Sequence, residues 1–290
     1  MPGISSLPQI EIALPGPLGN NIPMHSAANV FCHADNADGY VVYEQPLTER
    51  IRTFLRLEFL YGQVRHHARS QSSWGSRAAV QSLLDILAIL SRGDVRSEVL
   101  KELERQTLGL SEYQSNPQVD KGRLATRLET LTSLRGRLNS TGVQLAQPLK
   151  QSEFLNSVKH RSAIPGGTCV FDLPDYTHWL SRPSEQRQRD IEEWLKPLRP
   201  LCEAVLELLW LARQNAQPTK ETTRAGVFQH TLDRGDRCRL LRIAVTDGSG
   251  VYPEVSCSQR RFTVRFLTWR DVNRRPVQAS DETTFYLICC

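Results

Sequence analysis

Lysine, methionine and long apolar runs are all scarce in this chain of 290 residues. Six Lys stand beside 30 Arg, and there are two Met. Arginine recognises carboxylates and phosphates through its planar guanidinium group, so this bias favours an acidic partner, although a GC-rich genome would raise the Arg content everywhere. No run of about 18 uncharged apolar residues occurs, so we expect no membrane-spanning helix. The apolar fraction of 40% excludes a wholly disordered protein, and the net charge of +5 is modest.

Cysteine pairs at metal-binding spacing are also missing. The seven Cys include no C-x-x-C pair, and the last two, Cys289 and Cys290, are adjacent. An odd number of Cys in a long chain without a charged signal sequence favours reduced thiols over a disulfide framework. We therefore expect a cytoplasmic protein with no metal site.

The signatures of common enzymes are absent too. The sequence contains no Walker phosphate loop, no G-x-G-x-x-G, no H-E-x-x-H and no G-x-S-x-G. Gly166 and Gly167 are not followed by Lys-Ser or Lys-Thr, so we interpret them as a turn. His66 and His67 are adjacent, and we expect them to point apart rather than share a metal ion. Because no nucleophile is paired with a base, we predict no enzyme and no cofactor.

Residues 1–37 differ in composition from the rest of the chain. They contain no Lys or Arg and are rich in Pro, Gly, Ser and Asn. Their apolar residues are interrupted by Pro, and the charged start of a secretion signal is missing. We predict a disordered extension over 1–37.

Apolar residues recur at helical spacing between residues 51 and 151. Thr48, Asp94 and Asp120 stand at three predicted helix starts, where their side chains can cap free backbone N–H groups. Gly93 stands at one predicted helix end. We therefore predict a helical domain over 51–151.

The pattern changes in the second half of the chain. Helices are predicted over 152–161, 184–194 and 198–213, and a strand over 168–173. From about residue 224 the apolar period becomes two, which predicts strands over 238–246, 261–269 and 283–289. The fold class expected is α+β, with a helical domain and an antiparallel, sandwich-like β-rich domain.

The strand predicted over 261–269 carries the strongest candidate binding site. Because side chains alternate along a strand, Phe262, Val264 and Phe266 face one way. Arg261 and Arg265 face the other way, about 13 Å apart at ~3.3 Å per residue. Two guanidinium groups on one surface can bind an acidic peptide or phosphate groups, but a solvated outer face with salt bridges has the same pattern.

Further arginines are expected to enlarge this basic surface. Arg239 and Arg242 belong to the strand predicted over 238–246 in the same region. Arg56 follows Arg52 by one helical turn, so both lie on one outer face. Arg92 ends the second predicted helix, where its charge complements the helix dipole without any ligand.

Nucleic acid is the competing partner. The segment RRFTVRF interleaves Phe with Arg, but the alternation turns the rings away from the guanidinium groups. No helix-turn-helix or RNA-recognition signature accompanies it. A basic nucleic-acid-binding module therefore stands as the alternative to a peptide-binding protein.

Several segments together resemble the ZapD family of proteins associated with the bacterial division ring. They are VVYEQPLTERIRTFLRLEFL (41–60), SRGDVRSEVLKELERQ (91–106), IPGGTCVFDLP (164–174), VYPEVS (251–256), RRFTVRF (260–266) and the terminal Cys289-Cys290. The resemblance runs from about residue 40 to residue 290. It implies that residues 38–50 and 152–290 form the β-rich domain, with the two helices after 184 inserted in it.

The resemblance also implies a function. Members of this family are cytosolic homodimers that bind the C-terminal tail of the tubulin-like protein FtsZ and cross-link its filaments at the Z ring at midcell. The tail-binding arginines match Arg92, Arg261 and Arg265, and a position linked to bundling matches Arg56. Relatives can carry a basic residue in the segment that precedes the 164–167 turn. In this chain that segment begins with the acidic residue Glu153. The resemblance makes nucleic acid the less favoured partner.

Overall fold

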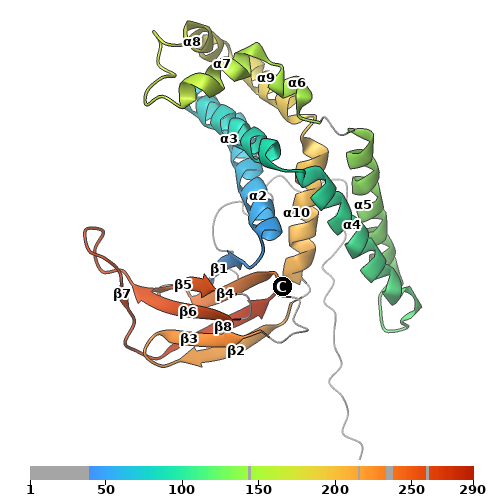
Figure 1. The fold of residues 1–290 in the computed structure, drawn as a ribbon, viewed down its shortest axis with the longest axis vertical. Helices are drawn as coiled ribbons and strands as arrows, with labels where there is room; N and C mark the ends of the chain where they lie inside the picture. Colours follow the sequence, from blue (N-terminus) through green and yellow to red (C-terminus); the bar gives the residue numbers. More distant parts are fainter. Residues whose placement is uncertain (1–38, 143–144, 215, 233–237, 259–260) are drawn as a thin grey trace, which may run out of the picture.

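The computed structural model describes residues 39–142, 145–214, 216–232, 238–258 and 261–290. Within this part of the chain, the helices form an elongated body that stands on a pair of antiparallel sheets (Figure 1). The predicted α+β fold class is confirmed. The extension predicted over 1–37 lies outside the described residues.

The helical body begins with two helices of 20 residues each, α2 (Glu49–Ala68) and α3 (Ser73–Arg92). Joined by a short connection, they lie side by side and antiparallel (Figure 1). The helices and the short 3-10 helix that follow are α4 (Val95–Ser111), η1 (Glu112–Ser115), α5 (Lys121–Ser140), α6 (Gln147–Lys150), α7 (Glu153–Ser162), α8 (Pro174–Ser181), α9 (Ser184–Leu195) and α10 (Arg199–Gln214).

Side-chain caps fix where three of these helices begin, as the sequence predicts. Thr48 Oγ1 accepts a hydrogen bond from the amide of Ile51 at 3.3 Å, which starts α2. Asp94 Oδ1 accepts one from the amide of Ser97 at 3.0 Å, which starts α4 directly after α3. Asp120 caps α5 in the same way. Each cap stabilises its helix by about 1 kcal/mol.

A single apolar core runs through the helical body. Helix α10 packs against α2, α4 and α5, while α9 packs against α2 and α3. The boundary predicted at residue 151 therefore does not separate two cores, because the helices within 153–214 share the core of α2–α5. The physical reason is that α10 is apolar on most of its surface. Its buried apolar residues are Leu201, Cys202, Ala204, Val205, Leu208, Leu209 and Leu211.

The described strands form two antiparallel sheets. The order is β1-β4-β8-β2 in one sheet and β3-β6-β5 in the other, with β7 paired to β6. The strands are β1 (Tyr40–Pro46), β2 (Pro218–Thr223), β3 (Val227–Thr231), β4 (Leu240–Thr246), β5 (Val251–Cys257), β6 (Arg261–Thr268), β7 (Val277–Gln278) and β8 (Thr283–Cys289). Their inward side chains form a second core, in which the rings of Phe266 and Phe285 lie 4.8 Å apart.

Residues 168–173, predicted as a strand, form turns instead. The amide of Cys169 donates to the carbonyl of Gly166, and the amide of Leu173 donates to the carbonyl of Cys169, each at 3.0 Å. Gly166 has a φ of 74°, in the left-handed region that glycine adopts without strain. Backbone groups that bond locally cannot join a sheet, so the strand prediction was wrong here.

Buried ion pairs hold the helical body on the sheets. Arg213, near the end of α10, donates to Glu44 on β1 and to Glu58 on α2, at distances of 2.6 to 2.8 Å. Burial alone would lower the pKa of Arg213, but the hydrogen bonds and charges of both carboxylates raise it overall. Arg242 on β4 lies 3.0 Å from Glu44 as well. We call this contact between α2, α10, β1 and β4 the joint.

Candidate functional site

Strand β6 displays two of the predicted site residues, Arg261 and Arg265. Its inner face is fixed in the sandwich, because Phe262, Val264 and Phe266 are each at most 1% exposed. The two arginines are exposed on the outer face, about 13 Å apart at ~3.3 Å per residue. The predicted alternation is confirmed, and the buried residues make β6 a rigid support for both guanidinium groups.

Both arginines have contacts that another molecule can displace. Arg261 Nη2 donates to the side-chain oxygen of Gln229 on β3 at 2.6 Å. Arg265 Nη1 lies 3.7 Å from Oε2 of Glu254 on β5, and these two side chains are 53% and 61% exposed. An exposed pair of this kind contributes about 0–1 kcal/mol. A carboxylate from a ligand can therefore compete for Arg265 at little cost.

The end of β6 that carries Arg261 is the end nearest the helical body. Strand β5 ends at Cys257, which pairs with Phe262 near the start of β6. Burial raises the pKa of the Cys257 thiol, and the positive charge of Arg52 opposes that shift. The first turn of α2 therefore lies near the start of β6. Figure 1 shows β6 running from this end toward β7.

Arg56 and Arg92 lie on α2 and α3 of the helical body. Arg56 is exposed on α2, one turn after Arg52. Arg92 is the exposed last residue of α3, two residues before the cap of α4 (Figure 1). Arg50 Nε donates to Glu98 of α4 at 2.8 Å, so the start of α4 lies near the first turn of α2. Neither Arg56 nor Arg92 forms an ion pair with another described residue.

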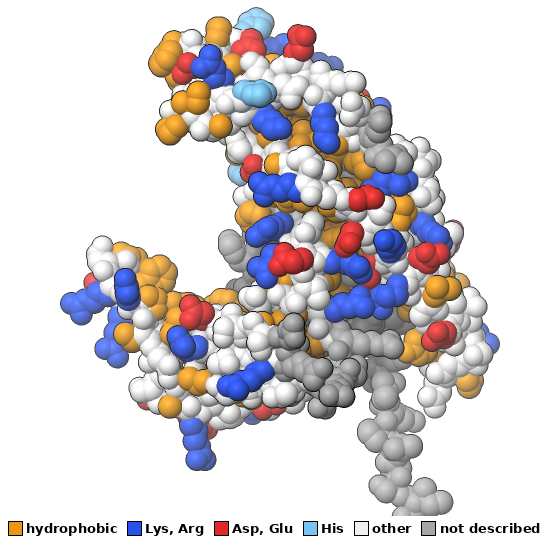
Figure 2. Space-filling model, viewed as in Figure 1, with side chains coloured by type: hydrophobic (Ala, Val, Ile, Leu, Met, Phe, Trp, Pro, Cys, Tyr) orange, Lys and Arg blue, Asp and Glu red, His pale blue; other side chains and the backbone are white. Residues whose placement is uncertain are grey.

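The structure places the four predicted arginines on three elements of the fold. Arg261 and Arg265 share β6, Arg56 lies one turn beyond Arg52 on α2, and Arg92 ends α3. In Figure 2, Lys and Arg side chains are also frequent over the middle of the helical body, mixed there with Asp and Glu. What distinguishes the predicted residues is how weakly they are paired.

Arg239 and Arg242 do not enlarge this surface, contrary to the prediction. They belong to β4 and its preceding residue, and β4 lies in the other sheet. Arg239 Nη1 lies 3.2 Å from Oε2 of Glu102 on α4, and Arg242 pairs with Glu44. Burial would raise the pKa of Glu102, but the hydrogen bond and charge of Arg105, together with the charge of Arg239, lower it. These arginines stabilise the contact between helices and sheets.

Two neighbours of the arginines were missed by the sequence analysis, Gln229 and Glu254. They lie on β3 and β5, which sequence periodicity did not predict as strands. The pairing register places Glu254 opposite Arg265, and no single strand carries that information. The motif VYPEVS, which includes Glu254, was noticed through the family resemblance alone.

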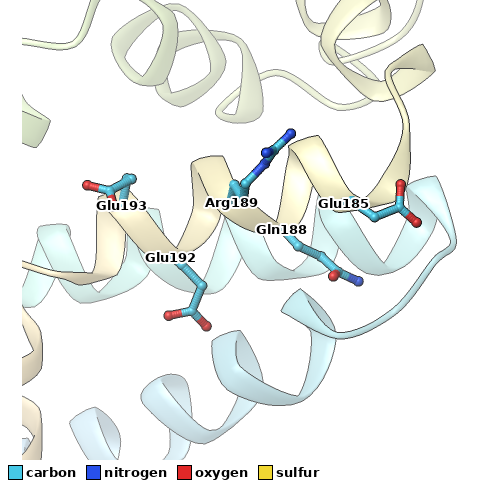
Figure 3. Close-up of a pocket in the computed structure, with 5 residues that line it drawn as sticks. All are labelled: Glu185, Gln188, Arg189, Glu192 and Glu193. Atoms are coloured by element: carbon cyan, nitrogen blue, oxygen red, sulfur yellow. The ribbon is translucent and has the colours of Figure 1, made fainter.

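A surface pocket on α9 is a poor candidate for a binding site. Figure 3 shows that its lining residues come from this one helix and point in different directions; they are Glu185, Gln188, Arg189, Glu192 and Glu193. Glu192 is already paired with Arg199. Among the described residues, no group of three or more His, Cys, Asp or Glu is placed to hold a metal ion. No helix in the described ranges is long and apolar enough to cross a membrane.

Proteins similar to this chain are cell division proteins. The family model ZapD, described as a cell division protein, matches residues 55–265, a range that contains all four predicted arginines. A cell division protein ZapD from Methylococcus capsulatus is 42% identical over 250 residues, which is 86% of this chain and 98% of that protein. The ZapD of Azoarcus sp. is 34% identical over 86% of this chain and 99% of its own length. The ZapD of Coxiella burnetii is 32% identical over 86% of this chain and 97% of its own length.

Proposed function

Since the chain belongs to the ZapD family of cell division proteins, we propose that it is a non-enzymatic cross-linker of FtsZ filaments. In this proposal it works as a homodimer in the cytoplasm and stabilises the Z ring at midcell. The partner is the acidic C-terminal tail of FtsZ. The residues that bind it are Arg56, Arg92, Arg261 and Arg265.

One observation carries the proposal: two exposed, weakly paired arginines on a rigid strand. Arg261 and Arg265 stand on β6, whose opposite face is buried in the sandwich. A guanidinium group binds a carboxylate through two parallel hydrogen bonds. Two arginines at a fixed separation therefore select acidic side chains by their spacing as well as by their charge. Arg56 and Arg92 add positive charge on α2 and α3, which helps to attract an acidic tail.

The homodimer supplies the cross-linking step. A single exposed contact of this kind is weak and sensitive to salt. When a dimer holds two tails from neighbouring filaments, the second contact forms within the complex, which raises the overall affinity without new contacts. The proposal therefore needs a dimer interface that leaves the arginines open.

We place that interface on the loop between α7 and α8. Phe171, Val170 and Ile164 are 86%, 64% and 50% exposed, and together they offer roughly 300 Å² of apolar surface, about the size of the largest apolar patch on a typical monomer, which is often functional. Arg77 near the start of α3 donates to the carbonyl of Thr168 at 3.0 Å, which holds this loop against the body. The loop thus sits at the start of α3, about 20 Å from the end of that helix at ~1.5 Å per residue. A second copy docked there leaves the arginines accessible.

The burial of the strand aromatics favours a peptide over nucleic acid. Non-specific binding of single strands uses exposed aromatic rings on which bases stack. Phe262 and Phe266 are turned into the sandwich, away from Arg261 and Arg265. The rings within RRFTVRF, the segment that first pointed to nucleic acid, are therefore not available for stacking, and the exposed ring of Trp269 lies beyond that segment.

Co-sedimentation with FtsZ filaments tests the proposal. Wild-type protein is expected to pellet with full-length FtsZ and to stay in solution with tail-deleted FtsZ. The variant Arg261→Glu/Arg265→Glu is expected to lose pelleting while its circular dichroism spectrum is unchanged, because both side chains are exposed. A matched control is Arg135→Glu/Arg189→Glu, which makes the same charge change on α5 and α9 and should pellet as wild type does.

The proposal has two clear failure modes. If Arg261→Glu/Arg265→Glu pellets as well as the wild type, these residues are not the tail site. If the wild type pellets equally with tail-deleted FtsZ, or binds DNA with strong salt dependence and ignores FtsZ, the function itself is wrong.

A further inference from the structure

The outer face of β6 continues past its two arginines into an apolar end. The alternation that exposes Arg261 and Arg265 puts Thr263 and Leu267 on the same face, and Trp269 is the first residue after the strand. Leu267 is half-buried, whereas Trp269 is 58% exposed. We call this row of five side chains the β6 strip.

Neighbouring strands add apolar surface beside the far part of the strip. The register places Tyr252 of β5 opposite Leu267, and Val227 of β3 opposite Arg265. Both are half-buried. Val272, in the connection between β6 and β7, is 81% exposed. The connection between β6 and β7 projects from the sheets as an arm, at the opposite end of β6 from the helices (Figure 1). Figure 2 shows hydrophobic side chains gathered on this arm.

The β6 strip therefore has a cationic end near the helices and an apolar end at the arm. At ~3.3 Å per residue, Leu267 stands about 7 Å and Trp269 about 13 Å from Arg265 along the strand. An extended peptide rises by nearly the same distance per residue. A peptide lying along the strip would thus meet the arginines and the apolar end with side chains two to four residues apart.

We infer that the β6 strip binds an extended peptide whose carboxylates pair with Arg261 and Arg265 and whose large apolar side chain packs on Leu267 and Trp269. The inference rests on the proposed function, in which this peptide is the FtsZ tail. It adds to that function the residues that recognise the apolar part of the tail. The charged end complements acidic side chains, and the apolar end rejects peptides that are acidic throughout.

The two ends contribute to binding in different ways. Exposed charges speed the encounter and make affinity depend on salt, because ions screen them. Covering the exposed part of the Trp269 ring removes on the order of 100 Å² of apolar surface from water, and this slows dissociation. After the cost of ordering the peptide, we expect this contact to be worth about a tenfold gain in affinity.

Fluorescence anisotropy with a labelled synthetic peptide of the FtsZ C-terminal tail tests the inference on the full-length chain. Trp269→Ala is expected to weaken binding about tenfold without changing the slope of log Kd against log salt. Trp269→Phe should keep most of the affinity, because it keeps an aromatic face. Arg265→Ala should weaken binding and also reduce the slope. The matched control is Tyr113→Ala, which removes a 47% exposed ring from η1 and should bind as wild type does.

The outcomes separate this inference from the proposed function. If Trp269→Ala binds as wild type does while Arg261→Glu/Arg265→Glu does not bind, the strip inference is overturned and the proposed function stands. If the wild type does not bind the peptide, both are overturned. If Trp269→Ala weakens binding of a single-stranded oligonucleotide but not of the peptide, the apolar end serves nucleic acid and the inference is wrong.

Discussion

Replacing Arg213 by Met tests the view that buried ion pairs fix the helical body on the sheets. Its guanidinium group makes four hydrogen bonds of 2.6 to 2.8 Å to Glu44 and Glu58, and its side chain is 15% exposed. Methionine matches much of the length of the Arg side chain but carries no charge. The substitution therefore leaves two carboxylates at the joint without this partner.

The expected loss follows from how buried those carboxylates are. Removing one partner of a buried ion pair costs about 3–5 kcal/mol, because the remaining charge stays desolvated. Glu44 keeps Arg242 at 3.0 Å and is 21% exposed, so it is partly compensated. The Glu58 side chain is 9% exposed and bears most of the loss. We expect the free energy of unfolding to fall by about 3 kcal/mol, which lowers Tm by about 6–12 °C in a chain of this size.

Thermal and urea unfolding followed by circular dichroism measure this loss. The matched control is Arg135→Met, which removes an exposed pair with Glu104 and should cost about 0–1 kcal/mol. Adding Glu58→Met to Arg213→Met should restore part of the stability, because the uncompensated charge is then gone. A loss for Arg213→Met no larger than that for Arg135→Met would refute the reasoning.

Other predictions concern the dimer, the pH dependence and the second core. Phe171→Ser should shift the protein toward monomer in light scattering while tail-peptide affinity per chain is kept; an unchanged dimer would contradict the proposed interface. The pKa of Glu102 lies below its usual 4.5 in the folded chain, so its stabilising effect is complete above that pH and is lost as the pH falls through the lower value. Glu102→Gln should therefore flatten the acid limb of a stability–pH curve. Phe266→Ala should cost about 3–5 kcal/mol in urea unfolding, because the ring is fully buried.

Local features of this fold could be predicted from the sequence because their causes are local. Thr48 and Asp94 start helices since their own side chains bond the next backbone amides. The two faces of β6 follow from alternation alone, and the last strand begins and ends where the pattern predicts. The exposed positions of Arg261 and Arg265 belong to this class, which is why their place on the outer face of β6 could be predicted.

Features that depend on distant contacts were missed or misplaced. Strand β1 pairs with β4, so Tyr40 lies opposite Thr246 across some 200 residues of chain, and no local pattern encodes that partner. For the same reason Arg239 and Arg242 were expected on the surface of Arg261 and Arg265, although β4 and β6 belong to different sheets. The family resemblance assigned α10 to the β-rich domain, whereas in the structure its apolar surface packs on α2, α4 and α5. An apolar helix surface shows that a helix is buried but not against what.

The arginines of this chain differ in how strongly they are paired, and this difference decides which of them can bind a ligand. The residues with strong partners, such as Arg213 and Arg239, lie where helices pack on sheets. Their ion pairs stabilise the fold, so these side chains are not available to bind a ligand. Arg265 lies on an exposed surface that packs against no other described element. Its partner Glu254 is 3.7 Å away, so it competes only weakly with a carboxylate from a ligand. A contact made there with a tail is weak and exchanges readily. In the proposed dimer that weakness is useful, because two weak contacts held together bind filaments firmly, while each one can release and find the next tail as the filaments turn over.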